Sequence, residues 1–300
     1  MDRTELAWAA GFWDGEGSAY LSGSSDRATK QPQARINQAS TAGVPEVLLR
    51  FQRALGFGDV QGATLKDGRE PLYRWEVSSR EDVRRTGVAL HAWLGRVKRE
   101  QFAATLCLAP PSRANDSETA RDEWIAWCAG LFDGEGSTYL LKHGSHAGHV
   151  VIETAITQSS FDGRPQVLER FRNIVSSGKV YGPYDTGPHW APVYRWKAHR
   201  RREIEQMLAL LWPQLGAVKR EQALAAMKVV SAQPLLPRGN PAWGNRKLTC
   251  VRGHDYEAAR VRPFRSRGKN VVPPRASHQC LTCVREAARA KRQRERKNGG

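Results

Sequence analysis

The chain has 300 residues, 47 Lys and Arg against 30 Asp and Glu, and a formal net charge of +17 at pH 7. A hydrophobic content of 40% with 10 Trp excludes wholesale disorder, and the lack of an apolar run of about 18 residues excludes a transmembrane helix. An odd number of Cys and no apolar segment near the N-terminus argue against a secreted disulfide protein. We therefore expect a cytoplasmic protein, in a bacterial or phage-infected cell, whose partner is a polyanion, most simply nucleic acid, and no membrane.

Local patterns in the first 110 residues predict the order α-β-β-α-β-β-α-α. Small residues mark the first helix, period-two alternation marks the strands, and Gly56 and Gly58 end the second helix. An antiparallel sheet with helices on one face leaves its other face bare, which suits a binding surface. In chain order the expected elements are a helix over 4–15, strands over 18–22 and 33–39, a helix over 45–55, strands over 59–64 and 72–78, and helices over 81–94 and 98–108.

The body of the chain is a tandem repeat. Residues 8–21 match residues 127–140 at 10 of 14 positions, and further matches follow at offsets of 120 and 121. Copies of this length are too long for solenoid units, so they predict two homologous domains related by a pseudo-two-fold axis, in a monomer. The expected domains are 1–110 and 122–232, joined by a linker over 111–121, with a second linker over 233–247 and a tail over 248–300.

The repeated first helix ends in a carboxylate followed by glycine, at Glu16 and at Glu135. Small residues let two such helices approach closely, and a crossing at the pseudo-two-fold axis would bring the two carboxylates together. Two carboxylates about 4 Å apart repel by roughly 4 kcal/mol at an effective dielectric near 20, so they would share a proton or bind divalent cations. Oxygen ligands with open water positions suit Mg²⁺ and metal-assisted phosphodiester hydrolysis.

These segments resemble the LAGLIDADG motif of homing endonucleases, with residues 9–17 and 128–136 standing for its nine letters. The resemblance covers about residues 4–230 and is closest to single-chain, two-repeat members. It implies an α+β fold of two α-β-β-α-β-β-α repeats that form a saddle of antiparallel sheets. It also implies that Glu16 and Glu135 hold Mg²⁺ and that Asp14 and Asp133 are structural. The initial Leu of the motif is absent from both copies, which affects helix packing more than chemistry.

Two further matched pairs fit this resemblance. The family places a Gln at the end of the second strand and a Lys near the start of the last helix, which correspond here to Gln38 and Gln158 and to Lys98 and Lys219. A Gln side chain can orient the attacking water, and a Lys can stabilise negative charge that develops in the transition state. The resemblance therefore implies these four as catalytic residues beside the two glutamates.

The bare sheet faces are expected to read double-stranded DNA. Arg74 and Arg195 occupy matched strands and are candidates for bidentate contact with guanine or phosphate. The two copies differ more here than in the motif, which suits an asymmetric site. The candidate DNA-binding residues are Tyr20, Ser22, Arg35, Asn37 and Arg74 in the first copy and Tyr139, His143, Thr157 and Arg195 in the second.

The C-terminal tail combines positive charge with metal-ligand spacing. Residues 238–300 hold 17 Lys and Arg against 4 Asp and Glu, a net charge of +13, which makes this tail the electrostatic anchor. Cys250 and His254, followed by Cys280 and Cys283, form a pattern that predicts a structural Zn²⁺ site, with His278 as a rival ligand. A basic helix after Cys283 is expected to lie along the phosphate backbone.

The sequence thus predicts a site-specific double-strand DNA endonuclease, a homing enzyme of a mobile element or intron, in which each copy cuts one strand. The rival class is a non-cleaving protein on the same fold, either a DNA-binding regulator or an intron maturase that binds RNA. Loss of a carboxylate or of the Lys and Gln pairs would favour the rival, and all six residues are present.

Overall fold

The structure is a computed structural model that describes residues 2–23, 30–65, 68, 70–109, 119–142, 150–187, 189–233, 261–264 and 277–298. The chain divides into two compact units, Met1–Gln233 and Pro234–Gly300. Across the described ranges, every helix is too short or too polar to cross a membrane.

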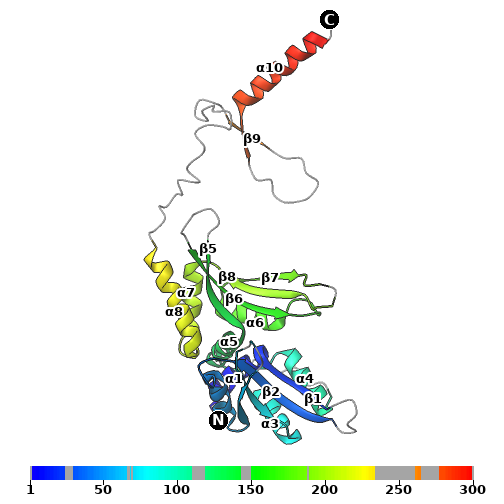
Figure 1. The fold of residues 1–300 in the computed structure, drawn as a ribbon, viewed down its shortest axis with the longest axis vertical. Coiled ribbons are helices and arrows are strands. Elements are labelled where there is room, and N and C mark those ends of the chain that lie inside the picture. Colours follow the sequence, from blue (N-terminus) through cyan, green and yellow to red (C-terminus); the bar gives the residue numbers. More distant parts are fainter. Residues whose placement is uncertain are drawn as a thin grey trace. The chain divides into compact units, whose positions relative to one another are not determined.

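The first unit contains the two repeats, and each repeat folds into one four-stranded antiparallel sheet with helices (Figure 1). The strand orders are β1-β2-β4-β3 and β5-β6-β8-β7, so the topology is the same in both copies. This arrangement confirms the predicted α+β fold of two repeats. The first repeat comprises α1 (Arg3–Glu16), β1 (Gly17–Ser22), β2 (Gln31–Ala39), α2 (Glu46–Leu55), β3 (Asp59–Thr64), β4 (Leu72–Val77), α3 (Arg80–Leu90) and α4 (Arg96–Leu106). The second comprises α5 (Arg121–Glu135), β5 (Gly136–Lys142), β6 (Val150–Ser159), α6 (Gln166–Val175), β7 (Lys179–Tyr184), β8 (Val193–Ala198), α7 (Arg201–Leu211) and α8 (Ala217–Ala232).

Helix boundaries follow local chemistry and differ from the predicted ranges at the start of α2, the end of α3 and the start of α4. Asp2 caps α1 by accepting a hydrogen bond from the Thr4 N–H. Pro45, expected inside α2, is its N-cap, because its extended ψ of 127° precedes the first helical turn. Helix α3 ends at Leu90 rather than at residue 94, and α4 begins at Arg96 rather than at Lys98. The chain turns between the two helices, where the N–H of Gly95 bonds to a buried carboxylate on α1.

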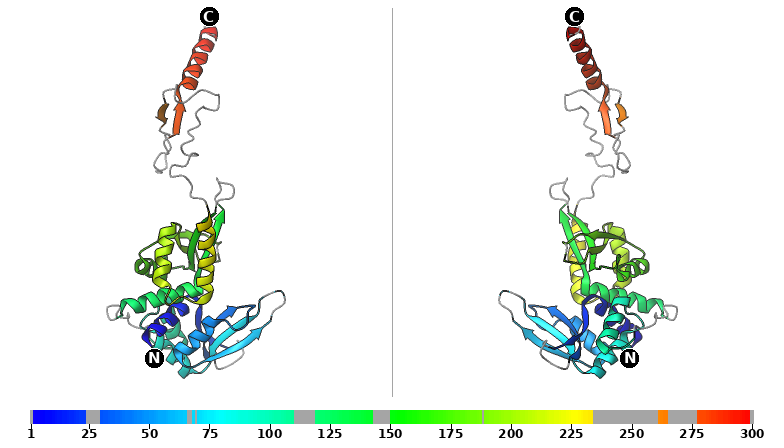
Figure 2. Two further views of the ribbon diagram at one scale, coloured as in Figure 1. Left: turned by 90° about the vertical axis from the view of Figure 1, so that its left-hand side faces the viewer. Right: turned by 90° about the vertical axis from the view of Figure 1, so that its right-hand side faces the viewer.

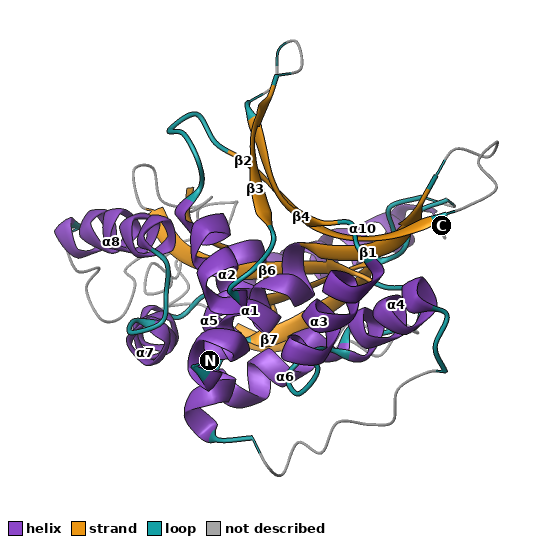
Figure 3. Cartoon of the chain, turned by 90° about the horizontal axis from the view of Figure 1, so that it is seen from below, coloured by secondary structure: helices purple, strands orange, loops and turns teal. Residues whose placement is uncertain are grey.

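The helices cover one face of each sheet and leave the other free, as Figure 3 shows for the first repeat. On β2, Ala34 and Ile36 are fully buried against the helices, whereas Gln33 and Arg35 alternate with them on the opposite side. We call this opposite side the open face. Under each sheet the core is aromatic, with the edge of Trp75 on Phe51 in the first repeat and an equivalent pair, Phe171 and Trp196, in the second.

The two repeats meet along α1 and α5, which pack side by side (Figure 2). A Cβ on Gly11 would lie 1.9 Å from the Trp127 carbonyl oxygen, and a Cβ on Gly130 would lie 1.9 Å from that of Trp8. Only glycine permits backbones to approach this closely. The two helices therefore form the pseudo-two-fold interface that the sequence predicted.

The second unit contains a short antiparallel hairpin and a helix. Strand β9 (Val261–Phe264) pairs with β10 (Ser277–Cys280), and helix α10 (Leu281–Asn298) follows directly. Along α10 the side chains of residues 284–289 and 291–293 are exposed. This part of the tail is therefore a solvated basic helix joined to a small sheet.

Candidate catalytic centre between the two repeats

Glu16 and Glu135 lie together at the adjoining ends of α1 and α5. A Cβ on Gly15 would lie 2.9 Å from the Glu135 Cγ, and one on Gly134 would lie 3.0 Å from the Glu16 Cγ, so each carboxylate side chain rests on the other repeat's glycine. Burial raises the pKa of both groups, and the neighbouring Glu16 carboxylate helps to bring that of Glu135 to about 7. The structure thus brings together the carboxylate pair that the sequence predicted.

The predicted Gln and Lys pairs surround these carboxylates. Gln38 opposes the rise in the pKa of Glu16 by hydrogen bonding to it, and Gln158 does the same for Glu135. The Lys98 Nζ donates to the Gly17 carbonyl oxygen at 2.6 Å, and the Lys219 Nζ donates to that of Gly136 at 2.6 Å. All six predicted catalytic residues therefore form one symmetric group. We call it the central cluster: Glu16, Gln38, Lys98, Glu135, Gln158 and Lys219.

Of the two glutamates, each lysine of the central cluster affects the pKa of the one from the other repeat more. Between the two ammonium groups, Lys219 lowers the pKa of Glu16 more, and Lys98 lowers the pKa of Glu135 more. Burial lowers the pKa of both lysines, and the surrounding carboxylates oppose that effect. The cluster therefore divides into two composite halves, Glu16 with Gln38 and Lys219, and Glu135 with Gln158 and Lys98.

The first acidic residue of each motif has a structural position behind the cluster. Both carboxylate oxygens of Asp14 accept the Gly95 N–H at 2.9 Å, which fixes the start of α4, and one also accepts the Trp127 indole N–H at 2.9 Å. Burial raises the pKa of Asp14 to about 6, although these hydrogen bonds lower it. Asp133 makes the equivalent contacts with Gly216 and Trp8, and its pKa is also about 6 because of burial.

Sequence reasoning missed the tryptophans and the backbone donors in these contacts. Trp8 and Trp127 begin the matched segments, so the repeat marked them, but nothing in the spacing shows that each indole N–H reaches the carboxylate of the other copy. Gly95 and Gly216 also occupy matched positions immediately before the last helix of each repeat. The only sequence signal for these contacts was that the tryptophans and glycines occur at matched positions in both copies.

On the open face of the first sheet the DNA-binding candidates lie on one side and make separate local contacts. The Tyr20 hydroxyl donates to Gln33 at 2.8 Å, and the Arg35 guanidinium lies 4.7 Å from the centroid of the Tyr20 ring. Arg74 donates to Asn37 at 3.1 Å. The Ser22 hydroxyl, near the end of β1, donates to the Gln31 carbonyl oxygen at 3.3 Å. The register pairs Tyr20 with Gln33 and Asn37 with Arg74, so these groups share one side of the sheet.

On the open face of the second sheet a carboxylate occupies the centre. Glu153 is 3% exposed and accepts hydrogen bonds from Tyr139 and, at 2.8 Å, from Lys197, while the His199 Nδ1 lies 2.8 Å away. Burial pushes the pKa of Glu153 upward, but Lys197 and Tyr139 outweigh that effect and hold it below its ordinary value.

The remaining candidates of the second copy lie on the same side or outside the described residues. Thr157 pairs with Arg195 across β6 and β8, and the Arg195 guanidinium lies 5.7 Å from the centroid of the Tyr184 ring. His143 lies outside the described residues. The second open face is therefore chemically different from the first at the position where Glu153 replaces Gln33.

A cavity of about 560 Å³ opens beside one half of the central cluster. We call it the side cleft; it is lined by Lys98 and Gln158 together with Arg96, Phe161 and Arg164. At the positions related by the repeat, the other half carries Ala217, Thr41 and Val44 instead. The two halves of the cluster therefore have the same inner residues and different surroundings.

The proposed zinc ligands are only partly described. Cys250 and His254, like the side chains of Cys280 and the rival ligand His278, lie outside the described residues. Cys283 is in the first turn of α10, immediately after β10, and is partly buried. Within the described ranges, His, Cys, Asp and Glu do not gather in groups of three or more that could hold a metal ion, so the carboxylates of the central cluster are a pair.

Comparison with solved structures identifies the fold. I-GzeII, a LAGLIDADG homing endonuclease in complex with its DNA target, matches with a TM-score of 0.55 and 16% identity over 75% of this chain and 89% of its own. The chain has the single-chain LAGLIDADG fold. The LAGLIDADG meganuclease I-AabMI, bound to uncleaved DNA, matches with a TM-score of 0.55 and 14% identity over 77% of this chain and 91% of its own. I-CpaMI, also a LAGLIDADG meganuclease bound to uncleaved DNA, matches with a TM-score of 0.52 and 13% identity over the same shares.

No protein-family model matches the LAGLIDADG-like chain by sequence, and no curated protein matches it either. At 13–16% identity the likeness to the solved structures concerns the fold alone. The chemistry of the site therefore depends on the residues of this chain.

Proposed function

We propose that this chain is a site-specific double-strand DNA endonuclease that works as a monomer, with one half of the central cluster cutting each strand. The observation that carries the proposal is the symmetric arrangement of two glutamates, two glutamines and two lysines at the interface of the repeats. The structural neighbours, which are LAGLIDADG enzymes bound to DNA, support double-stranded DNA as the substrate.

The donor set of the central cluster fits a divalent cation. Both carboxylates are partly buried, and the Glu16 carboxylate adds to the cost of ionising Glu135; a bound cation would remove that cost. Oxygen donors favour Mg²⁺, and with only two protein carboxylates the remaining ligands would be water and DNA phosphate. When bound, the metal would stabilise charge on the phosphate and supply an acidified water.

The residues of the chain supply the rest of the hydrolysis. Gln38 and Gln158 can hold and orient a water beside the glutamate that each contacts. Lys98 and Lys219 are cations fixed by backbone carbonyls, so they can stabilise negative charge on the phosphate as the P–O bond breaks. A fixed donor needs little reorganisation at the moment of reaction, which is the source of its effect.

Strand-resolved cleavage tests this proposal. Glu16→Gln and Glu135→Gln should each lower cutting of one strand by at least about a hundredfold, on opposite strands, because each removes an electrostatic contact in one composite half. Binding of duplex DNA in EDTA should remain close to that of the unmodified protein. Glu46→Gln, an exposed carboxylate on α2, is the control and should leave both strands unaffected.

Retained cutting of both strands in either variant would refute the assigned roles. If the unmodified protein binds duplex DNA or RNA and cuts neither, the non-cleaving regulator or the RNA-binding maturase becomes the better account of the fold.

The tail is proposed to add affinity by contacting phosphate. Residues 238–300 carry +13 of the net charge, and the described side chains of α10 past its first turn are exposed. Truncation after Pro237 should weaken DNA binding and flatten its dependence on salt, since fewer counterions are released. An unchanged slope of log Kd against log salt would contradict this role.

A structural Zn²⁺ held by Cys250, His254, Cys280 and Cys283 remains a proposal that rests on spacing. Elemental analysis of the purified chain should find about one zinc per chain, and Cys283→Ser should abolish it. A metal-free protein with unchanged α10 helicity would contradict the zinc module.

A further inference from the structure

We propose that Trp8 and Trp127 are positioning residues, each of which reaches across the pseudo-two-fold interface to hold the lysine that serves its own repeat's glutamate. The inference deepens the proposed endonuclease function and rests on it. It concerns buried residues outside the central cluster.

The contact chain on one side runs from the first repeat into the second and back. The Trp8 indole N–H donates to the Asp133 carboxylate at 2.8 Å, and both oxygens of Asp133 accept the Gly216 N–H at 2.9 Å. Gly216 is the N-cap of α8, so this contact fixes where the helix begins. Lys219 lies in the first turn of that helix and reaches the Gly136 carbonyl oxygen. A shift of Asp133 would therefore move the ammonium group of Lys219.

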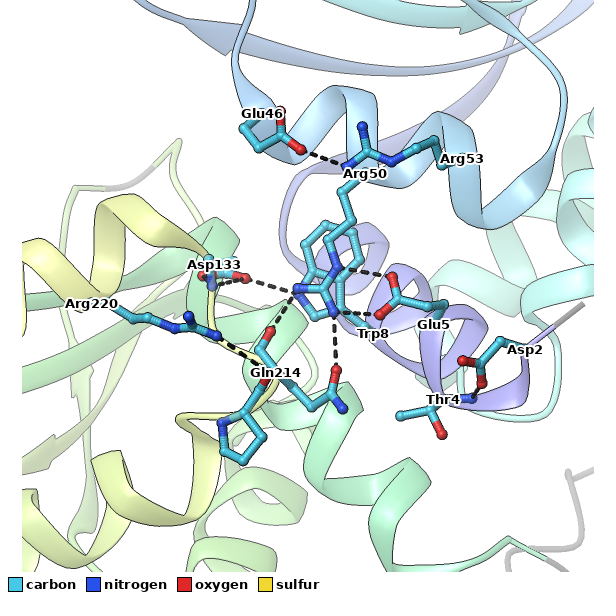
Figure 4. A network of polar contacts seen from close by, with 12 residues as sticks. Asp2, Thr4, Glu5, Trp8, Glu46, Arg50, Arg53, Asp133, Gln214 and Arg220 are labelled. Carbon is cyan, nitrogen blue, oxygen red and sulfur yellow. Dashed lines mark hydrogen bonds and ion pairs between the residues drawn. The ribbon is translucent and has the colours of Figure 1, made fainter.

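Arg50 contacts Trp8, the hydrogen-bond donor at the start of this series of contacts, as Figure 4 shows. Its guanidinium lies 4.1 Å from the centroid of the Trp8 ring and is paired with Glu5 at 2.7 Å. It also donates to the Gln214 carbonyl oxygen at 2.6 Å and to the Gln214 side-chain oxygen at 3.0 Å. Gln214 is two residues before Gly216, so Arg50 and Trp8 hold the same loop from two sides.

The same arrangement recurs on the other side of the interface. Trp127 donates to Asp14, which accepts the N–H of Gly95, the N-cap of α4 that carries Lys98. The Arg170 guanidinium lies 5.3 Å from the centroid of the Trp127 ring and donates to the Trp93 carbonyl oxygen at 3.0 Å. Trp93 is two residues before Gly95, just as Gln214 is two residues before Gly216. Two independent copies of one geometry argue against an incidental contact.

The direction of the contacts gives each tryptophan a distinct target. Trp127 belongs to the repeat of Glu135 and fixes Lys98, which lines the side cleft together with Gln158, the glutamine that bonds to Glu135. Trp8 belongs to the repeat of Glu16 and fixes Lys219, the lysine at the matched position. By the symmetry of the repeats, each tryptophan therefore holds the lysine of the composite half to which its own repeat supplies the glutamate.

The test measures cutting of each strand of one defined target by Trp8→Phe and Trp127→Phe. Phenylalanine keeps an aromatic ring under the arginine and removes only the N–H donor. Trp8→Phe should slow the strand cut by the Glu16 half by about tenfold or more relative to the other strand, because a buried carboxylate loses a hydrogen bond. Trp127→Phe should slow the opposite strand. Trp124→Phe is the control, because Trp124 lies on α5 like Trp127 and its ring also contacts the Arg170 guanidinium. In this variant the ratio of the cutting rates of the two strands should stay unchanged.

Equal slowing of both strands in Trp8→Phe and Trp127→Phe would overturn the inference. That result is expected if each substitution only destabilises the whole protein, because a general loss of stability affects the cutting of both strands alike. Amide hydrogen exchange gives a readout independent of cutting. Exchange at Gly216 should accelerate in Trp8→Phe and that at Gly95 should not, with the reverse in Trp127→Phe.

If the unmodified protein fails to cut, the endonuclease proposal fails alone, and the exchange data still decide whether each tryptophan holds its loop. Unchanged exchange at both glycines in both variants would refute the positioning role, whatever the activity.

Discussion

The two repeats are nearly identical where they touch and different where they face outward. At the interface, every group of the central cluster and the indole hydrogen bond of each supporting tryptophan have a matched partner at an offset of 119 to 121 residues. On the open faces, Gln33 bonded to Tyr20 in one copy becomes the buried Glu153 bonded to Tyr139 in the other. The chemistry of the proposed reaction is thus symmetric, whereas its recognition surface is not.

That difference has a physical reason. Both strands of a DNA duplex present the same phosphodiester, so two equal catalytic halves serve both. Base edges differ along any non-palindromic site, so two equal reading faces would serve only a palindrome. Substitutions at the interface therefore test the symmetric part of the molecule, and substitutions on the open faces test the asymmetric part.

The largest effect is expected at the helix pair of the interface. Gly11→Ala places a methyl group 1.9 Å from the Trp127 carbonyl oxygen, where the backbone of α5 cannot yield without moving the whole helix. We expect a loss of about 4 kcal/mol or more of the free energy of unfolding, or no folded protein, measured by chemical denaturation. Gly62→Ala in β3, where a Cβ meets nothing within 4 Å, is the control. A fully stable Gly11→Ala protein would show that the close helix approach is wrong.

The next effect concerns the pH dependence of stability without metal. The folded-state pKa of Glu135, about 7, and those of Asp14 and Asp133, about 6, exceed their ordinary values of 4.5 and 3.8. The native state therefore binds more protons than the unfolded state, and stability falls as pH rises from about 4 to about 7. In EDTA the melting temperature should be several degrees higher at pH 5 than at pH 8.

Mg²⁺ should partly reverse this trend, since the cation binds the ionised carboxylates and displaces their protons. The rise in melting temperature on adding Mg²⁺ should therefore be larger at pH 8 than at pH 5. A rise that is equal at both pH values, or one that survives Glu16→Gln with Glu135→Gln, would place the metal elsewhere.

A smaller effect is expected on the asymmetric faces. Glu153→Gln gives the second sheet the residue that the first has at Gln33 and removes the negative partner of Lys197 and His199. Binding to non-specific duplex DNA should tighten severalfold, and its salt dependence should steepen by about one counterion as Lys197 becomes available to phosphate. Gln33→Glu, the reciprocal change, should weaken binding. Identical binding in both variants would mean that these positions do not face DNA.

The smallest effect is expected in the side cleft. Arg164 lines it beside Lys98 and Gln158, whereas the matched position on the other side is Val44. Arg164 is exposed and forms an ion pair with Glu169, so its contribution is expected to be small. Arg164→Ala should slow only the strand cut by the Glu135 half, by about twofold to fivefold. Val44→Ala is the matched control. A comparable loss on both strands would contradict a role limited to one side.

The fold and the central cluster could be predicted because the repeat marked them twice. The motif segment indicated the interface helices, and the resemblance to the LAGLIDADG family, at positions matched between the copies, indicated the two glutamines and the two lysines. The supporting contacts could not be predicted in the same way. The Trp8 indole meets a carboxylate 125 residues away, and Gly216 contributes a backbone N–H that carries no side-chain signature. Such contacts depend on the angle at which two helices cross, which no local pattern in the sequence states.

The boundaries of α3 and α4 illustrate the same limit. Residues 91–94 follow an apolar pattern that continues the helix in the sequence, but the structure ends α3 at Leu90, and Gly95 bonds to Asp14 on another helix. A tertiary hydrogen bond to a buried carboxylate here outweighs local helix propensity.

We propose that this chain cuts both strands of DNA with metal-dependent chemistry at the interface of its repeats. Cleavage of a randomised duplex library by the purified full chain, with Mg²⁺ and with EDTA, followed by sequencing of the ends, tests this directly. We expect Mg²⁺-dependent cuts on both strands at one recurring sequence, and none in EDTA. Retained binding to duplex DNA or RNA with no Mg²⁺-dependent cuts would contradict it.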